Sequence, residues 1–252
     1  MLDLIVNENK QLNDQYFLLI LGADEKLPEM LPGQFVEVRV DNSAETFLRR
    51  PISINYVDYQ QNELWLLIQI VGEGTRKLST CKKGDILNLL LPLGNSFTIP
   101  ENADAKLLLV GGGVGIAPLL YLGSKLKEKG ITCDFLLGGR SMENLLQLDD
   151  FAAYGNVYTT TEDATYGEKG FVTNHSILTK NKYDLIYSCG PTPMMKAVAA
   201  YAQTTNTVCE VSLENTMACG FGACLCCVTD STEGHVCVCT EGPVFNILKL
   251  KW

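Results

Sequence analysis

The residues best suited to chemistry in this 252-residue sequence are its cysteines, because six of the ten lie within the last 34 residues. Four of the six follow the pattern C-x4-C-x2-C with a further cysteine twelve residues on: Cys219, Cys224, Cys227 and Cys239. A [2Fe–2S] cluster takes four thiolates, and this is their plant-type spacing. Gly220 and Gly222 fit the same chemistry, since loop amides must approach the cluster closely. The spacing therefore predicts a [2Fe–2S] cluster.

Other uses of these cysteines remain open. The Cys-x2-Cys at 224–227 and the Cys-x-Cys at 237–239 have the spacing of a zinc site, and disulfides or buried structural thiols are further alternatives. A Rieske centre requires two histidines, whereas only His235 lies nearby. If the stretch around Cys237 is a strand, this surplus cysteine shares a face with Cys239 and competes with it for the fourth ligand position.

A glycine-rich turn is the second feature that indicates a ligand. Gly111, Gly112, Gly113 and Gly115 separate an apolar run from a helix that contains Pro118. Glycines at this point let the backbone reach a pyrophosphate at the helix N-terminus, although Ile116 takes the place of the third glycine of G-x-G-x-x-G. A second turn of this kind, Cys189-Gly190-Pro191, follows another apolar run. Together the two turns predict a dinucleotide site.

A basic stretch in the N-terminal part is the third feature. Arg50-Pro51-Ile52-Ser53 offers a guanidinium for a diphosphate and a hydroxyl for a bound ring system, and Gly72–Thr75 forms a turn further on. Taken alone, this stretch is more typical of a strand that carries a basic residue than of a binding site.

Short strands divided by turns are expected to position that basic stretch. Residues 36–40 alternate as a half-buried strand does, and residues 64–71 suit a buried strand that stops at Gly72. Residues 86–91 form another strand, which ends at the breaker at 92–95. This pattern predicts a small antiparallel barrel over residues 1–98.

Alternating strands and helices are expected to position the two glycine turns. Strands are predicted at 107–110, 131–137, 157–161 and 184–188, with helices at 118–129 and 193–203. This alternation is typical of a doubly wound, mostly parallel sheet over residues 99–210. It also accounts for the uncharged run at 107–124, which has the length of a short membrane span but is broken by five glycines and a proline.

The remaining residues, 211–252, are too poor in apolar side chains to build a core and need a bound metal to stabilise their fold.

The formal net charge of −9 argues against binding to nucleic acid or anionic membrane. The first eleven residues carry acidic groups where a secretory signal would be basic, so we expect a cytoplasmic protein without a membrane span, in which clustered thiols bind metal or do redox chemistry.

Taken together, these motifs resemble the ferredoxin–NADP reductase superfamily and, more narrowly, the electron-transfer subunits of class 1B dihydroorotate dehydrogenases. The resemblance spans nearly the whole chain and is most specific where the cysteine segment follows the nucleotide domain and ends in Cys239-Thr-Glu-Gly-Pro-Val-Phe245. It implies a flavin-binding barrel, a nucleotide-binding domain and a small iron–sulfur segment. Gly-Pro-Val-Phe after Cys239 favours that residue over Cys237 as the fourth ligand.

The resemblance also implies site residues and partners. FAD is expected to bind at Arg50, Pro51, Ile52, Ser53, Leu67, Ile68, Gln69, Gly74 and Thr75. NAD is expected to bind at Gly111, Gly112, Gly113, Gly115, Cys189, Gly190 and Pro191. The implied function is electron transfer in pyrimidine biosynthesis, from an FMN-containing subunit that oxidises dihydroorotate, through the cluster and FAD to NAD⁺. The implied assembly is a heterotetramer of two of each subunit.

Three points stay open. A related sulfide dehydrogenase or ferredoxin–NAD(P)⁺ oxidoreductase subunit would have the same build, and a zinc-binding interaction module is an alternative of another class. Arg140 follows the second strand of the nucleotide domain, where a guanidinium could meet the 2′-phosphate of NADP, although NAD is the expectation. Thr161-Glu162-Asp163-Ala164 departs from the Asp-Asp-Gly-like turn expected from the family.

Overall fold

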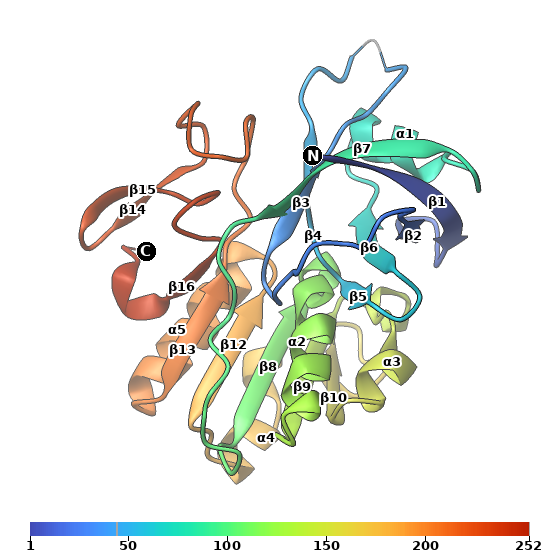
Figure 1. The fold of residues 1–252 in the computed structure, drawn as a ribbon. Coiled ribbons are helices and arrows are strands. Elements are labelled where there is room, and N and C mark those ends of the chain that lie inside the picture. Colours follow the sequence, from blue (N-terminus) through green and yellow to red (C-terminus); the bar gives the residue numbers. More distant parts are fainter. Residues whose placement is uncertain (44, 252) are drawn as a thin grey trace.

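The computed structural model describes residues 1–43 and 45–251, which form two large sheets and a small C-terminal segment (Figure 1). The strands are β1 (Leu2–Gln11), β2 (Tyr16–Gly22), β3 (Phe35–Val38), β4 (Arg50–Ser53), β5 (Tyr56–Asp58), β6 (Glu63–Gln69), β7 (Ile86–Leu93), β8 (Leu107–Gly112), β9 (Cys133–Gly139), β10 (Asn156–Thr161), β11 (Glu168–Lys169), β12 (Leu185–Cys189), β13 (Val208–Ser212), β14 (Val228–Ser231), β15 (Gly234–Cys237) and β16 (Val244–Asn246). The α-helices are α1 (Glu73–Ser79), α2 (Ala117–Glu128), α3 (Leu148–Ala152), α4 (Ile177–Lys180) and α5 (Thr192–Thr204). Four short 3₁₀ helices are η1 (Gly113–Ile116), η2 (Met142–Asn144), η3 (Val172–Asn174) and η4 (Ile247–Lys249).

The first sheet is antiparallel throughout and has the strand order β4-β3-β7-β1-β2-β6-β5. It curls around a core of alternate inward-facing residues such as Leu4, Leu19 and Leu66, none of which is exposed. The curling brings β4 close to β6 across the open side of the sheet. The predicted antiparallel barrel is therefore confirmed.

Two local predictions for this sheet are wrong. The strand expected to alternate over residues 36–40 is β3, and all its residues are buried, Glu37 included, because the C-terminal segment covers the face that was expected to meet solvent. The proline expected to end a strand, Pro92, lies inside β7 after a cis peptide bond. The predicted stop at Gly72 is right, because β6 ends at Gln69, but the helix α1 that follows it was not predicted.

The second sheet has the order β11-β10-β9-β8-β12-β13-β16, and every pair except β13–β16 is parallel. Successive residues of β8 point to opposite faces. Leu107 and Leu109 pack with α2, and Leu108 and Val110 pack with α5. Helices thus cover both faces, and the predicted doubly wound fold is confirmed. Chain order reverses between β8 and β12, which makes this point of the sheet the expected ligand crevice.

The uncharged run at 107–124 consists of β8, η1 and the start of α2. Within the described ranges, none of the helices has the length and apolarity that a membrane crossing requires.

The C-terminal segment leaves the second sheet after β13 and returns to it as β16. Between these strands it forms the hairpin β14–β15, and β16 then pairs antiparallel with β13, with Ser212 opposite Val244. The buried Val238 and Phe245 pack in the same cluster as Leu108 and Val211 of the sheet. The segment therefore shares the core of the nucleotide domain, in line with its poverty in apolar residues.

A pair of side-chain amides, one buried and one half-buried, joins the barrel to the nucleotide domain. Asn55, which is not exposed at all, donates to the carbonyl of Ala117 at the start of α2 over 3.1 Å. The side chains of Asn55 and Gln147 exchange two further hydrogen bonds of 3.1 Å each. Close by, the buried Tyr121 hydroxyl donates to the carbonyl of Met30 over 2.9 Å. These contacts fix how the barrel lies on the nucleotide domain.

We predict that Ala164→Gly stabilises the chain. Ala164 has φ +64°, a left-handed conformation, at the position where the sequence departs from a glycine-containing turn. Removing Cβ strain of about 1 kcal/mol, less the added entropy of the unfolded chain, should raise the melting temperature by about 1–3 °C. The measurement is thermal unfolding followed by circular dichroism.

Ala153→Gly is the matched control, because Ala153 caps α3 with φ −66° and ψ −21°, where glycine has no advantage. This variant should melt at a lower temperature than the wild type. Equal melting temperatures for the two variants would contradict the strain at Ala164.

Candidate cofactor-binding sites

A first cavity of about 310 Å³ lies between the open side of the barrel and the start of the second sheet. Eight of the nine predicted FAD residues line it: Arg50, Pro51, Ile52, Ser53, Leu67, Ile68, Gln69 and Thr75. They come from β4, β6 and α1, which are far apart in the sequence. Val114 and Ala117 close the cavity from the nucleotide domain. The mostly apolar walls and one guanidinium suit a flat ring system that carries a diphosphate.

Gly74, the ninth predicted residue, lies behind this wall. A Cβ atom there would come within 2.4 Å of Nε of Arg50, so glycine leaves the room that the guanidinium occupies. The Thr75 hydroxyl accepts hydrogen bonds from the amides of Val71 (2.9 Å) and Gly72 (3.2 Å). Gly74 and Thr75 therefore shape the turn beside Arg50.

A second, larger cavity of about 640 Å³ runs along the carboxyl ends of the parallel strands. Five of the seven predicted NAD residues line it: Gly112, Gly113, Gly115, Gly190 and Pro191. Gly111 and Cys189 lie behind the wall, where Cys189 is fully buried and burial raises the pKa of its thiol. The lining also includes Tyr16 of the barrel, which sequence reasoning did not single out.

The two glycine turns touch each other through their backbones. A Cβ atom on Gly115 would lie 2.4 Å from Cα of Gly190, and one on Gly190 would lie 3.0 Å from the carbonyl oxygen of Gly112. Gly113 and Gly190 also have φ of +57° and +151°. The turns after β8 and β12 can form this cradle only with glycine at these positions, which fits a pyrophosphate held by backbone amides.

The two cavities share a wall made of Gln69, Val114 and Glu214. Glu214 lines both cavities and is exposed in them, and desolvation by the surrounding protein raises the pKa of its carboxyl. Sequence reasoning missed this residue, because a single glutamate after a strand carries no distinctive pattern. Groups bound in the two cavities would meet at this wall.

The cysteine loop is arranged around its sulfur atoms. Each of the four predicted ligands accepts a backbone N–H at sulfur, with donors at 3.1–3.5 Å: Gly222 to Cys239, Cys224 to Cys219, Cys226 to Cys224 and Cys239 to Cys227. In the described ranges, the surplus Cys226 and Cys237 have no such bond at sulfur. Amide donors that point at thiolates are typical of iron–sulfur sites.

Hydrogen bonds between thiols join Cys219 to Cys224, and they join Cys227 to both Cys239 and the surplus Cys237. Each iron of a [2Fe–2S] cluster takes two thiolates, so the pair Cys219–Cys224 and either pair that contains Cys227 match it. Burial opposes ionisation of Cys219, but the amides of Phe221, Ala223 and Cys224 outweigh it and lower the pKa of the thiol to about 6. The donor set therefore fits the predicted cluster, although Cys237 also contacts Cys227.

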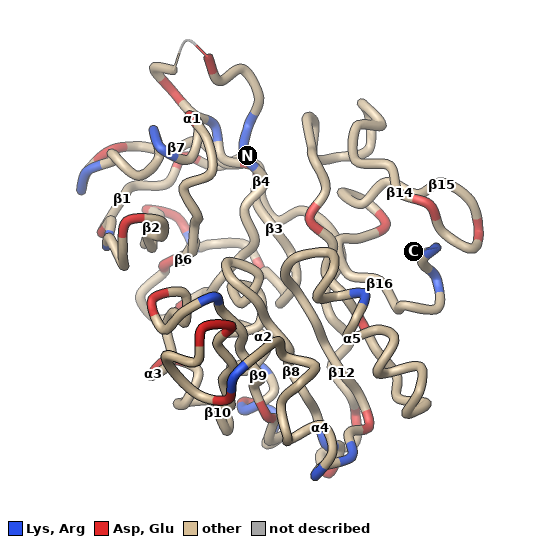
Figure 2. The backbone as a smooth tube through the Cα atoms, turned by 180° about the vertical axis from the view of Figure 1, so that it is seen from behind, with Lys and Arg blue, Asp and Glu red and all other residues tan. Residues whose placement is uncertain are grey.

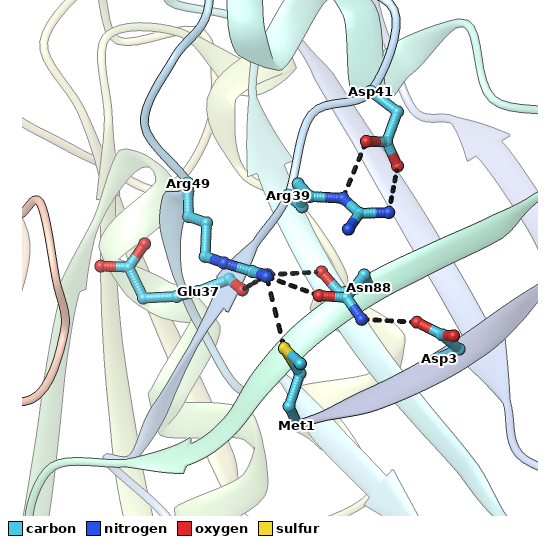
Figure 3. A network of polar contacts seen from close by, with 7 residues as sticks. All are labelled: Met1, Asp3, Glu37, Arg39, Asp41, Arg49 and Asn88. Carbon is cyan, nitrogen blue, oxygen red and sulfur yellow. Dashed lines mark hydrogen bonds and ion pairs between the residues drawn. The ribbon is translucent and has the colours of Figure 1, made fainter.

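Glu37 is a buried carboxyl beside this loop. The alternating pattern of its strand had predicted that it faces solvent. Both its carboxylate oxygens are without a hydrogen-bond partner in the described part of the chain. Arg49 bonds to the backbone carbonyl of Glu37 and to Asn88, while the Glu37 carboxylate points the other way (Figure 3). Burial raises its pKa to about 7. A Cβ on Gly220 would lie 2.8 Å from Cγ of Glu37, so the cluster loop packs directly on it.

Comparison with known proteins supports the iron–sulfur assignment and the NAD assignment. The family described as the iron–sulfur cluster binding domain of dihydroorotate dehydrogenase B matches residues 214–251, and the oxidoreductase NAD-binding domain matches residues 109–200. The first match contains all four predicted ligands and favours iron–sulfur over the zinc alternative. The electron transfer subunit of dihydroorotate dehydrogenase B (NAD⁺) from Bacillus velezensis is 39% identical over 247 residues, covering 96% of each chain. The chain belongs to the family of dihydroorotate dehydrogenase B electron transfer subunits.

Comparison with solved structures shows that the chain has the fold of related reductases. An NADH-dependent reduced ferredoxin–NADP oxidoreductase has a TM-score of 0.88 and 30% identity, over 100% of this chain and 90% of the other. The cytochrome b5 reductase domain of Ulva prolifera nitrate reductase shares the fold alone, with a TM-score of 0.68 and 14% identity over 81% of this chain and 92% of its own. The reductase fold, the flavin, the NAD and the [2Fe–2S] cluster expected for a member of the family are thus confirmed, while the individual ligands stay predictions.

For this family member we predict that Cys239→Ser abolishes cluster binding and Cys237→Ser does not. Cys239 accepts the amide of Gly222 and pairs with Cys227, whereas Cys237 lacks an amide donor in the described structure. Iron and acid-labile sulfide should fall to near zero in the first variant and stay at the wild-type level in the second. The reverse result would make Cys237 the fourth ligand.

We also predict that Arg50→Ala lowers FAD retention. The variant removes the guanidinium from the first cavity, and a charge-assisted bond to a phosphate is worth about 1.5–3 kcal/mol, so the affinity should fall about tenfold or more. Flavin absorbance after gel filtration measures retention. Arg39→Ala is the control, because Arg39 pairs with Asp41 outside the cavity. Unchanged flavin content in Arg50→Ala would contradict the assignment.

Proposed function

We propose that this chain is the electron-transfer subunit of an NAD-dependent dihydroorotate dehydrogenase in pyrimidine biosynthesis. Its redox groups are a [2Fe–2S] cluster and FAD, its donor is an FMN-containing catalytic subunit, and its acceptor is NAD⁺. The chain itself does not carry the dihydroorotate site. The names of relatives that are 38–39% identical over nearly their whole length support this function.

The shared wall of the two cavities is the observation that carries the proposal. A flavin converts between single electrons and a hydride, which is the exchange required between an iron–sulfur cluster and NAD⁺. The chain positions the two reactants for that exchange, since Gln69, Val114 and Glu214 line both cavities. Val114 lies within the glycine turn, between Gly113 and Gly115, so the same backbone shapes both sites.

The C-terminal segment links the cysteine loop to this wall. Leu213, Glu214, Asn215 and Met217 line the first cavity and immediately precede Cys219. One continuous stretch forms both a wall of the flavin site and the start of the cluster loop. The last residue of that wall, Met217, is only two residues from the first predicted ligand, Cys219. Such a short link suits electron transfer between the two groups.

The surface around the cysteine loop fits a permanently bound partner. Residues 215–229 contain no Asp, Glu, Lys or Arg, and Phe221 and Leu225 are 60% and 64% exposed. In Figure 2 the loops that rise above β14 are accordingly tan. Uncharged apolar surfaces are typical of obligate interfaces, whereas transient encounters between redox proteins rely on charge steering. We infer that a catalytic subunit covers this surface, in a heterotetramer of two of each subunit.

A second candidate function is that of a ferredoxin–NAD(P)⁺ oxidoreductase subunit. The solved ferredoxin–NADP oxidoreductase that resembles the chain over its full length favours it. The higher identity to the dihydroorotate dehydrogenase B subunits, 39% against 30%, favours the first function. No disulfide joins any of the ten cysteines, all of which lie in the described part of the chain, and this suits the reducing cytoplasm in which either function would operate.

The proposed function predicts activity that depends on both subunits. The complex with the FMN-containing subunit should reduce NAD⁺ with dihydroorotate, and removing this chain should abolish that activity while dye-linked dihydroorotate oxidation persists. Spectrophotometry at the NADH absorbance band measures the first activity. Persistent NAD⁺ reduction without this chain, or a stable complex with an unrelated oxidoreductase instead, would overturn the proposal.

Gel filtration of the same complex tests the interface. Leu225→Glu places a charge on the apolar surface and should separate the subunits in gel filtration. Val208→Glu is the control, since Val208 is 53% exposed at the amino end of β13, away from the cavities. Separation by both variants, or by neither, would contradict the placement of the partner.

A further inference from the structure

A buried histidine lies directly behind one wall of the second cavity. This wall is the stretch 170–173, and all four of its residues line the cavity. His175 follows two residues later and is only 7% exposed. Its backbone N–H donates to the carbonyl of Val172 over 3.2 Å, which ties the histidine to the wall. Neither hydride transfer nor cluster binding requires this imidazole.

The contacts of His175 fix which ring nitrogen carries the proton. Nδ1 accepts the buried backbone N–H of Ile177, the first residue of α4, over 3.0 Å. A ring nitrogen that accepts a hydrogen bond carries no proton, so the proton of the neutral ring is on Nε2. Nε2 faces a carboxylate oxygen of Glu168 in β11 at 3.5 Å. The neutral ring therefore joins β11 to the start of α4.

Protonation of His175 must break the contact with α4. The second proton can go only onto Nδ1, where it points at the N–H of Ile177. Two donors then face each other, and the buried amide loses its acceptor. Ile177 is itself buried and packs in the same cluster as Val172 of the cavity wall. A charged imidazole is thus incompatible with the closed arrangement of residues 170–177.

In the described structure, the elements packed around this segment present two charged groups and two phenols. The Glu168 carboxylate favours the charged imidazole, and Lys180 of α4 disfavours it. Tyr158 of β10 packs edge to face on the ring at 5.6 Å, and the Tyr201 hydroxyl of α5 donates to a carbonyl of α4. Burial, together with Lys180, outweighs Glu168 and lowers the pKa of His175. The closed arrangement therefore loses stability as the pH falls below about 6.5, the pKa of a solvent-exposed histidine.

We propose that His175 is a pH-sensitive switch of the NAD site: the neutral ring holds the wall at 170–173 closed, and protonation in acid releases this wall and weakens nucleotide binding. The inference rests on the proposed function in so far as the second cavity holds NAD⁺. In the closed arrangement Val172 packs on the end of β9, since a Cβ on Gly138 would lie 2.6 Å from its Cγ1. Release of the wall removes this surface from a bound nucleotide.

Two measurements on the full chain, loaded with oxidised flavin and cluster, test the switch between about pH 7.5 and about pH 5.5. Hydrogen–deuterium exchange, corrected for the intrinsic rate at each pH, reports the protection of the amides at 172–178. Calorimetry reports the affinity for NAD⁺. In the wild type both quantities should fall with pH below about 6.5, by up to about tenfold for each pH unit, because the open segment binds one more proton.

His175→Asn is the decisive variant, because it keeps the acceptor and removes the titration. An asparagine side-chain oxygen accepts the N–H two residues on, as Asn13 does for Gln15 over 2.9 Å in this chain. Desolvation also raises the pKa values of Glu37 and Glu214, so the signal is the difference between the two slopes. Both slopes should be shallower in His175→Asn than in the wild type.

His235→Asn is the matched control. His235 is the only other histidine of the sequence, and it lies exposed on the hairpin β14–β15, where it pairs with Asp230 at 2.7 Å. This variant should keep the wild-type slopes.

Glu168→Gln provides an independent measurement if the asparagine variant folds poorly. It removes the carboxylate that favours the charged imidazole, while its remaining oxygen can still accept the amide of Ser176. The fall in protection and affinity should therefore move to lower pH.

Equal slopes in the wild type and His175→Asn, or an unmoved fall in Glu168→Gln, would overturn the proposal. Loss of protection without loss of affinity would overturn the link between the histidine and the NAD site. Neither measurement requires dihydroorotate or the partner subunit. A failed dihydroorotate assay therefore leaves this test valid, and a failed test of the switch leaves the electron-transfer function standing.

Discussion

The amide pair formed by the buried Asn55 and the half-buried Gln147 is the contact on which the arrangement of the cofactor sites depends. It ties the barrel to the first residue of α2, and that residue, Ala117, is also a wall of the first cavity. A shift of the barrel would pull Gln69 away from Val114 and open the wall between the cavities. Buried amides with matched partners allow only one arrangement, because any other leaves polar groups unpaired. The alignment of flavin and nicotinamide sites thus rests on hydrogen bonds whose side chains, Asn55 and Gln147, line neither cavity.

Glu37 shows how closely the third site is coupled to the first. Its strand, β3, pairs with β4, and Pro51 of the first cavity stands opposite Glu37 in the register. On its other side, the Glu37 side chain packs against Gly220 of the cluster loop. A buried carboxyl without hydrogen-bond partners destabilises a fold. Packing alone therefore does not explain why a glutamate lies between the cluster loop and the flavin site.

The sequence was most informative where chemistry restricts both residue type and spacing. The cysteine spacing, the glycine turns and the strand–helix alternation predicted three sites and both sheets, because few side chains can bind iron or permit close backbone contacts. It was least informative about surfaces that become buried by distant segments. Glu37 alternates like a solvent-facing residue, and only the C-terminal segment, nearly two hundred residues later, covers it. Glu214 and Tyr16 likewise enter the cavities through tertiary packing, which no local pattern encodes.

The pairing of β16 with β13 gives the C-terminal segment an unusual status. Residues 213–243 leave and rejoin the sheet at directly opposed positions, Ser212 and Val244, so the ends of this stretch lie about 5 Å apart. A two-residue hairpin could close that gap, which makes the iron–sulfur segment topologically an insertion into an otherwise complete flavin reductase. It is not a removable cassette, however, since both of its ends, through Leu213 and Pro243, also line the first cavity. The insertion has become part of the flavin site that it serves.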